Sequence, residues 1–156
     1  MASLIRTADA VAMELATSGL EPNAPYTIWW VVFNSPAGCS DPCNEDDILA
    51  DDGTMNLNPD AQISMIFADG AISDATGSAS FSALLPSGRT LGQVVAGPGL
   101  TNAEGAEVHL VVRYHGPAEL ARLYDQLSTY DPDPSAGGVC ELCSDQQFAV
   151  FQAAIN

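Results

Sequence analysis

The sequence contains no lysine. Its four basic residues, Arg6, Arg89, Arg113 and Arg122, oppose 20 aspartates and glutamates, which leaves a net charge of −16. Such a surface repels phosphate backbones and anionic lipid head groups, so we expect no nucleic-acid partner and no unaided binding to a membrane surface. The same acidic surface is compatible with binding to cations and to basic proteins. The carboxylates also suit a saline medium, where salt screens their repulsion beyond about 8 Å.

Long apolar runs and the usual catalytic signatures are absent as well. A membrane-spanning helix needs roughly 20 apolar residues, and the longest apolar run is Ile28 to Phe33, so we expect no membrane insertion by this segment. There is no G-x-S-x-G elbow, P-loop, H-E-x-x-H or dinucleotide fingerprint. The chain has two histidines, and no carboxylate pair stands out as a glycosidase pair. We therefore expect a protein that is not an enzyme.

The four cysteines fall in two close pairs, Cys39 with Cys43 and Cys140 with Cys143. Tight pairs predict two disulfides or one four-thiolate zinc site. Acidic residues flank both pairs and no cation lies nearby, which favours disulfides. A redox-active C-x-x-C, the third alternative, lacks the βαβ context of thioredoxin-like proteins. Of the three pairings we prefer the local ones, although bonds between the pairs would staple the fold more strongly.

Disulfides indicate an oxidising compartment, so we expect an extracellular, periplasmic or cell-surface protein. Residues 1–4 lack the basic and apolar regions of a secretory signal, and we expect that such a signal has been removed.

The remaining composition is that of a folded chain. Hydrophobic residues make up 47% of the 156 residues and charged residues 15%, which argues against disorder despite the net charge. A chain of this length buries about two thirds of its unfolded surface. We expect a single domain over residues 1–156.

Apolar stretches separated by turn-rich segments predict about seven to eight strands. They lie at residues 10–15, 26–33, 63–67, 77–85, 90–95, 108–115 and 146–152. This pattern is typical of a mostly β fold, an immunoglobulin-like β-sandwich, with one appended α-helix near residues 117–128. The spacing of Leu20, Pro22 and Tyr26 resembles the corner of fibronectin type III domains, where a tyrosine hydroxyl ties back to the preceding turn.

The strand at 26–33 is apolar on both faces. Trp30 lies on one face and Trp29 on the other. Such a strand must be covered on both sides, or it must present one aromatic face as a binding platform.

The helix is predicted from Pro117 at its first position and Glu119 in its first turn. Its apolar stripe consists of Leu120, Leu123, Tyr124 and Leu127. We expect this stripe to cover the second apolar face of the strand at 26–33.

His109, Arg113 and His115 share one face of the strand at 108–115. Six residues at about 3.3 Å each separate the histidines too far for one metal ion. We expect Arg113 to form an ion pair with an acidic neighbour. The three residues are, with Trp29 and Trp30, our candidates for ligand binding.

Residues 34–59 have no sustained period and form a long loop, which is the first place to look for a site. Hard oxygen ligands suit calcium, and the acidic part, 44–60, offers Asp46, Asp47, Asp51, Asp52 and Asp60. Asp52-Gly53 resembles the middle of an EF-hand or dockerin-type loop. However, Ile48, Ala50 and Pro59 occupy positions where acidic ligands would stand.

Two longer stretches, YTIWWVVFNSPAGC and AEVHLVVRYHGPAEL, together with QFAVF near the end, resemble a group of uncharacterised secreted or lipid-anchored bacterial and archaeal proteins. That group carries the motifs Y-T-x-W-W-x-x-F-N-x-P-x-x-C and H-L-V-V-R-x-H-G-P. The resemblance implies an exported protein with disulfides and brings no activity or ligand with it.

Three functions fit these observations. The first is a secreted, non-enzymatic module that binds an extracellular ligand or protein, through Trp29 or Trp30 and the acidic loop. The second is a calcium-dependent binding module, for which calcium is the one cofactor we consider. The third is a structural subunit that self-associates through its sheet edges.

Overall fold

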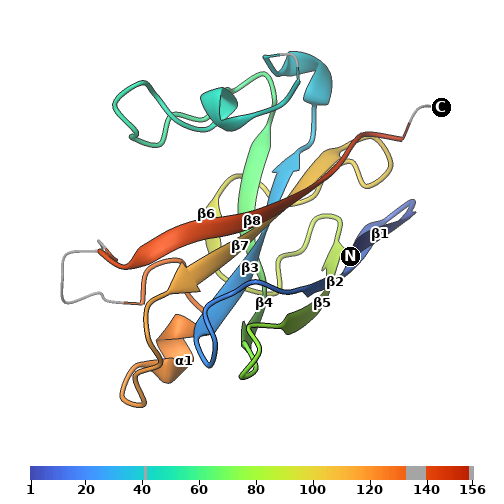
Figure 1. Cartoon of the computed structure of the whole chain (residues 1–156). Coiled ribbons are helices and arrows are strands. Elements are labelled where there is room, and N and C mark those ends of the chain that lie inside the picture. Colours follow the sequence, from blue (N-terminus) through green and yellow to red (C-terminus); the bar gives the residue numbers. More distant parts are fainter. Residues whose placement is uncertain (41, 133–139, 155–156) are drawn as a thin grey trace.

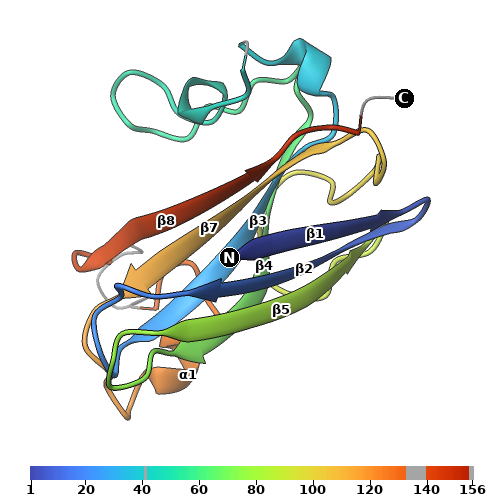
Figure 2. The ribbon, with the colours of Figure 1, turned by 45° about the vertical axis from the view of Figure 1, so that its right-hand side comes forward.

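A computed structural model describes residues 1–40, 42–132 and 140–154. It shows a mostly β fold of two sheets (Figures 1 and 2), which confirms the predicted sandwich. The strands are β1 (Ala2–Thr7), β2 (Ala10–Thr17), β3 (Pro25–Phe33), β4 (Ile63–Ile72), β5 (Ala79–Pro86), β6 (Val94–Ala96), β7 (Glu107–His115) and β8 (Cys143–Phe151). Among the described residues, no helix has the length and apolar character needed to cross a bilayer.

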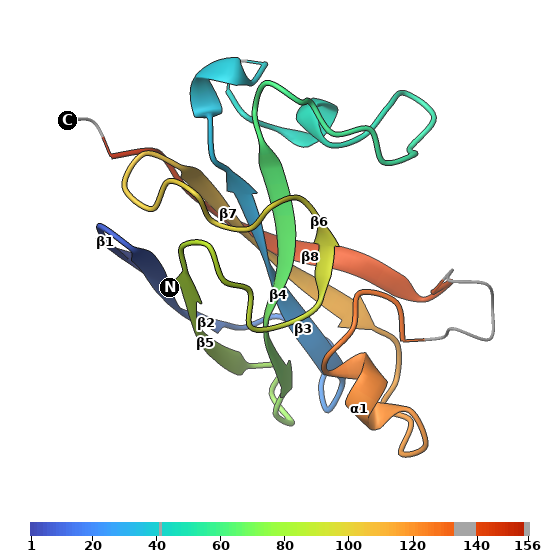
Figure 3. The same cartoon turned by 180° about the vertical axis from the view of Figure 1, so that it is seen from behind.

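One sheet has the order β1-β2-β5 and the other the order β6-β4-β3-β7-β8, with antiparallel pairing throughout. The edges are therefore β1 and β5 in one sheet and β6 and β8 in the other, and Figure 3 shows β6 beside β4. The main core lies between the sheets, where Ile28, Trp30 and Val32 of β3 meet Val11 of β2 and Phe81 of β5. The other face of β3 looks away from the three-stranded sheet.

The predicted strands are all found, with altered bounds. β4 continues five residues beyond the predicted end at 67, into a stretch whose glycine and aspartate predict a turn, and β6 keeps only the end of the predicted stretch 90–95. β1 was not predicted, because its residues alternate between partly buried and exposed and include only two large apolar side chains.

The predicted corner is present. The buried hydroxyl of Tyr26 accepts a hydrogen bond of 2.8 Å from the backbone N–H of Glu21. Burial raises the pKa of this tyrosine, although the hydrogen bond from Glu21 acts in the opposite direction. The chain turn before β3 is thereby fixed to the strand.

The predicted helix is present but shorter than expected, and its predicted apolar stripe does not pack as expected. Only α1 (Leu123–Gln126) is helical, and Leu120 and Tyr124 of the expected apolar stripe are 93% and 81% exposed. Gly116, with φ of +79°, turns the chain sharply after β7. The buried amide of Gln126 then closes the segment, because it donates to the carbonyls of His115 and Pro117 and accepts from the N–H of Glu119. These bonds hold residues 115–119 in a turn, so the helix begins later than the apolar spacing predicts.

Three of the four arginines have ion-pair or hydrogen-bond partners, and two of them connect different strands. Arg6 of β1 donates to the carbonyls of Ala103, Phe151 and Gln152 and so joins the two sheets. Arg113 of β7 pairs with Asp145 of β8, and Arg122 pairs with Glu119. Arg89 lies exposed in the segment between β5 and β6.

Both cysteine pairs form disulfides, with Cα–Cα separations of 5.0 Å for Cys39–Cys43 and 5.2 Å for Cys140–Cys143. The preferred local pairing is therefore confirmed, and in this structure none of the four cysteines is a free thiol.

Candidate functional site

The outer face of the five-stranded sheet carries a second, smaller core. Trp29, Val31 and Phe33 of β3 pack there against Ile63 and Met65 of β4. The cover is the β3–β4 loop, defined as residues 34–62, which projects past the ends of both strands in Figure 1. Its contributions are Cys39, Cys43, Ile48, Leu57 and Ala61. The loop, and not the predicted helix, thus covers the second apolar face of β3.

Asp47 organises the β3–β4 loop. Its buried carboxylate accepts hydrogen bonds from the N–H and hydroxyl of Ser40, the N–H of Asn44 and the side-chain amide of Asn58. Burial raises the pKa of Asp47, but these donors outweigh it and hold the pKa below its ordinary value. The two ends of the loop lie close together at Gly38 and Asp60. Any larger residue at position 38 would clash there, since its Cβ would stand 2.3 Å from the carbonyl oxygen of Asp60.

The loop covers only part of the sheet face and leaves a cleft beside it of about 400 Å³. The apolar lining is Trp29, Val31, Met65 and Val111 from the sheet, Phe148 from β8 and Ile48, Leu49 and Met55 from the loop. The polar lining is Asn44, Glu45, His109, Tyr130 and Asp145. We call this space the outer cleft. Its size falls within the range of small-molecule sites, about 300–1,000 Å³.

The two basic side chains closest to the outer cleft, His109 in its lining and Arg113 beside Tyr130, already have partners. The guanidinium of Arg113 donates to Asp145 at 2.8 Å and to the carbonyl of Tyr130, and it lies 4.0 Å from the centroid of the Tyr130 ring. This confirms the expected ion pair of Arg113. Nε2 of His109 lies 2.6 Å from the buried carboxylate of Glu107. Glu45, by contrast, is exposed at the rim, so the cleft has a net acidic edge.

Neither tryptophan forms the exposed aromatic platform that the sequence suggested. Trp30 points into the main core and Trp29 into the outer one, and each is 1% exposed. Trp29 forms edge-to-face contacts with Phe67 and Tyr130. It therefore contributes to the outer cleft only as part of its floor.

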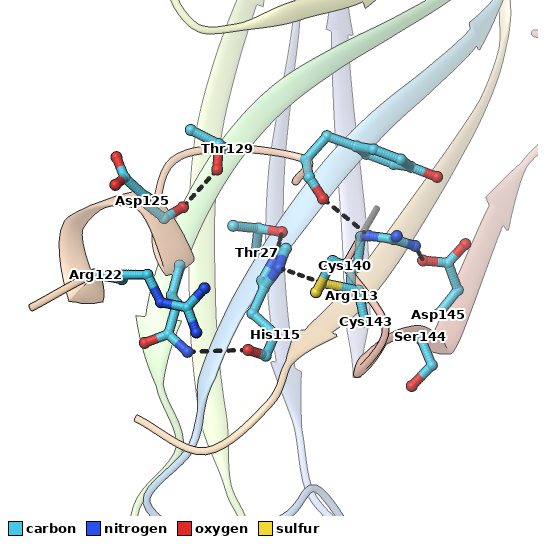
Figure 4. The surroundings of a disulfide bond; sticks show 12 residues. Thr27, Arg113, His115, Arg122, Asp125, Thr129, Cys140, Cys143, Ser144 and Asp145 are labelled. Carbon is cyan, nitrogen blue, oxygen red and sulfur yellow. Dashed lines mark hydrogen bonds and ion pairs between the residues drawn. A yellow bond between two sulfur atoms is a disulfide. The ribbon is translucent and has the colours of Figure 1, made fainter. Parts of the chain in front are cut away.

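His115 lies apart from His109, at the other end of β7, where Figure 4 shows it between Thr27 and the Cys140–Cys143 disulfide. Its Nε2 is 2.6 Å from the Thr27 hydroxyl and its Nδ1 is 3.2 Å from Sγ of Cys143. The ligand atoms of His115, Cys140 and Cys143 lie within 4.8 Å of one another. In this structure, however, the two sulfurs are bonded to each other.

The five aspartates proposed for calcium do not form a cluster. Within the described ranges, no group of three carboxylates brings its ligand atoms within 4.8 Å of one another. Asp47 is buried among protein donors, whereas Asp46, Asp51, Asp52 and Asp60 are exposed. Asp52 accepts from the N–H and hydroxyl of Thr54, and these bonds lower its pKa. Calcium binding stays a prediction, without a preformed ligand set in the part of the chain described.

Most residues of the outer cleft were not identified from the sequence. Phe148 could have been identified from the sequence. It lies on the same face of the final strand as Val150, and this repeat indicates an apolar surface there. No sequence pattern identifies Ile48, Leu49 and Met55, because the apolar residues of the loop follow neither a helix nor a strand repeat. Leu49 and Met55 meet only through an isolated antiparallel bridge.

No protein-family model, no curated protein and no solved structure matches this chain. The function proposed below is therefore argued from the geometry of the chain itself.

Proposed function

We propose that this chain is an exported binding module and that the outer cleft is its ligand site, with no catalytic role in that cleft. The observation that carries the proposal is a concave apolar surface of the right size beside an exposed carboxylate, on a sheet face that the loop covers only in part. Phe148 and Met55 on its borders are 64% and 47% exposed. Exposed apolar groups next to a pocket are typical of a binding surface.

The proposed ligand has an apolar or aromatic body and one positive charge. Glu45 supplies an exposed carboxylate, and the exposed ring of Phe148 can contact a cation, whereas the ring of Tyr130 already contacts Arg113. Arg113 and His109 already contact the carboxylates of Asp145 and Glu107. An anionic ligand would have to displace these carboxylates before it could bind either basic side chain. The net charge of −16 also attracts cations over the whole surface.

The lining favours binding over nucleophilic catalysis. Glu107 and His109 form an acid–base pair, but no serine, threonine or cysteine belongs to the residues that line the outer cleft. Export is supported by the two disulfides, because such bonds persist in oxidising compartments.

The test uses two matched probes, 2-phenylethylamine as the cation and 3-phenylpropionate as the anion, in titrations followed by protein-observed NMR. We expect the amine to shift the amide signals of Val31, Val111 and Leu49, with binding that weakens as salt rises. Phe148→Ala and Glu45→Gln should each weaken binding at least about fivefold, since each removes one half of the recognition.

Leu84→Ala is the matched control, because Leu84 is an exposed apolar residue of the other sheet. Equal binding of the two probes would refute the cationic preference. Shifts confined to other regions, or unaffected by Phe148→Ala, would refute the outer cleft as the site.

A further inference from the structure

The two disulfides have different surroundings. Cys43 is 6% exposed and belongs to the outer core, and Cys39, which is partly exposed, packs against it. Cys140 and Cys143 are both partly exposed and belong to neither hydrophobic cluster. An external thiol can therefore attack either sulfur of Cys140–Cys143 without opening the core, whereas Cys39–Cys43 offers only the sulfur of Cys39.

A buried imidazole faces one sulfur of the accessible disulfide. His115 is 3% exposed, and its Nδ1 lies 3.2 Å from Sγ of Cys143 (Figure 4). On the other side of the ring, Nε2 lies 2.6 Å from the hydroxyl of Thr27. That hydroxyl also receives a 2.7 Å hydrogen bond from the indole N–H of Trp29.

We assign the proton of His115 to one ring nitrogen from the contacts of Thr27. The indole N–H is a donor only, so the Thr27 oxygen accepts from it. Thr27 is fully buried, and Nε2 of His115 is the acceptor that its own hydroxyl proton reaches. Nε2 is then unprotonated, and the proton is on Nδ1. The Nδ1–H group therefore points at Sγ of Cys143.

We propose that Cys140–Cys143 is a redox-active disulfide that oxidises dithiols, and that His115 stabilises Cys143 as the leaving thiolate. The substrate class is an accessible dithiol, either a small molecule or a cysteine pair on another exported protein. The proposal is independent of ligand binding in the outer cleft.

The reaction is a two-step exchange. A substrate thiolate attacks Sγ of Cys140, a new S–S bond forms, and the electron pair of the broken bond goes to Sγ of Cys143. The Nδ1–H group of His115 donates to this thiolate, and a better-stabilised leaving group departs faster. The second substrate thiolate then attacks the substrate sulfur of the mixed disulfide and releases Cys140. The substrate loses two electrons and two protons, and the two cysteines gain them.

The nearby charges have opposite effects on the stability of a Cys143 thiolate. Arg113 is close enough to influence His115 electrostatically and favours a thiolate, whereas Glu141 and Asp145 oppose it. Asp145 is already paired with Arg113. The hydrogen bond from His115 is thus the one direct stabilisation that the described residues offer to Cys143.

The first experiment compares the two disulfides of the folded protein under limiting dithiothreitol, with EDTA present so that no metal traps the thiols. Alkylation and peptide mass spectrometry report each pair separately. We expect Cys140–Cys143 to be reduced at least about tenfold faster. Equal rates, or faster reduction of Cys39–Cys43, would overturn the proposal.

The second experiment measures the equilibrium constant for oxidation of dithiothreitol by the pair. His115→Gln presents its amide toward Thr27 and loses the donor to Cys143, whereas His115→Asn keeps a donor at the Nδ1 position. We expect a loss of about tenfold for His115→Gln, which corresponds to about 30 mV, and a smaller loss for His115→Asn.

Thr27→Val, which preserves volume and removes the hydroxyl, is a second probe in case the histidine variants do not fold. It should lower the same constant severalfold, and Thr27→Ser should not. Identical constants for all four variants and the parent would show that the imidazole has no part in the exchange. The reduction rate of Cys39–Cys43 serves as the internal control for folding.

Discussion

At the scale of single residues, a few buried polar groups determine the geometry around β3 and β7. The hydroxyl of Thr27 connects Trp29 to His115, and the amide of Gln126 holds the carbonyl of His115 at 3.0 Å. Each of these groups has partners on different elements. Polar groups in such positions are costly when left without partners, so they specify one arrangement of the chain.

His115 should make stability depend on pH. Burial, assisted by the charge of Arg113, lowers its pKa from 6.5 to about 4. The unfolded chain therefore binds a proton near pH 6.5, whereas the folded chain binds it only near pH 4. Between these values the unfolded state holds more protons, so the free energy of unfolding falls as pH falls, by up to about 3 kcal/mol.

Denaturant titrations between pH 7 and pH 4 measure this decrease. His115→Gln should remove the His115 contribution, and His109→Gln should keep it. A pH profile that is the same for the parent and His115→Gln would contradict the assignment. The lowered pKa of Asp47 adds a separate loss of stability at still lower pH, as that carboxylate is protonated.

At the scale of elements, the β3–β4 loop should depend on Asp47. Asp47→Asn replaces an acceptor of four hydrogen bonds by an amide that cannot accept all of them, and we expect a loss of about 1–3 kcal/mol. Asp52→Asn, at the exposed tip, is the matched control and should leave Tm unchanged. Thermal melts measure both variants, and a Tm for Asp47→Asn equal to that of the parent would contradict this role.

The same melts with added calcium test the sequence-based calcium prediction. That prediction requires a rise in Tm which Asp51→Ala combined with Asp52→Ala abolishes.

The elements that could be predicted from the sequence are those whose apolar residues recur at a regular spacing. β7 alternates clearly, and β3 shows two apolar faces, so both could be placed with their facing residues. The helix near 117–128 is present but limited to Leu123–Gln126, because the side-chain hydrogen bonds of Gln126 hold the residues before it in a non-helical turn. The packing of the β3–β4 loop on the outer face of β3 could not be predicted. The loop residues that pack there, Cys43, Ile48 and Leu57, follow no repeat in the sequence.

The site beside the second disulfide was predictable only in part. The C-x-x-C spacing indicated a local bond, which the structure confirms. The contact of His115 with Cys143 depends on the register of β7 with β8, in which these two residues are paired. No sequence pattern states that register.

At the scale of the whole molecule, the net charge of −16 should limit stability in dilute buffer. Raising NaCl from about 0.01 M to about 1 M shortens the Debye length from about 30 Å to about 3 Å. We expect Tm to rise by several degrees over this range. Differential scanning calorimetry measures the change, with sucrose at equal osmolality as the control for solute exclusion. A Tm that falls, or that rises equally in sucrose, would contradict charge repulsion as the cause.

The placement of the arginines determines where trypsin-like proteases can cut the folded chain. Enzymes that cut after basic side chains find no lysine here. Arg6, Arg113 and Arg122 are partly buried and hydrogen-bonded, whereas Arg89 lies exposed between β5 and β6. A cut at Arg89 would separate two fragments that the β3–β7 and β4–β6 ladders still join. Trypsin-like attack should therefore nick the molecule once and leave it assembled.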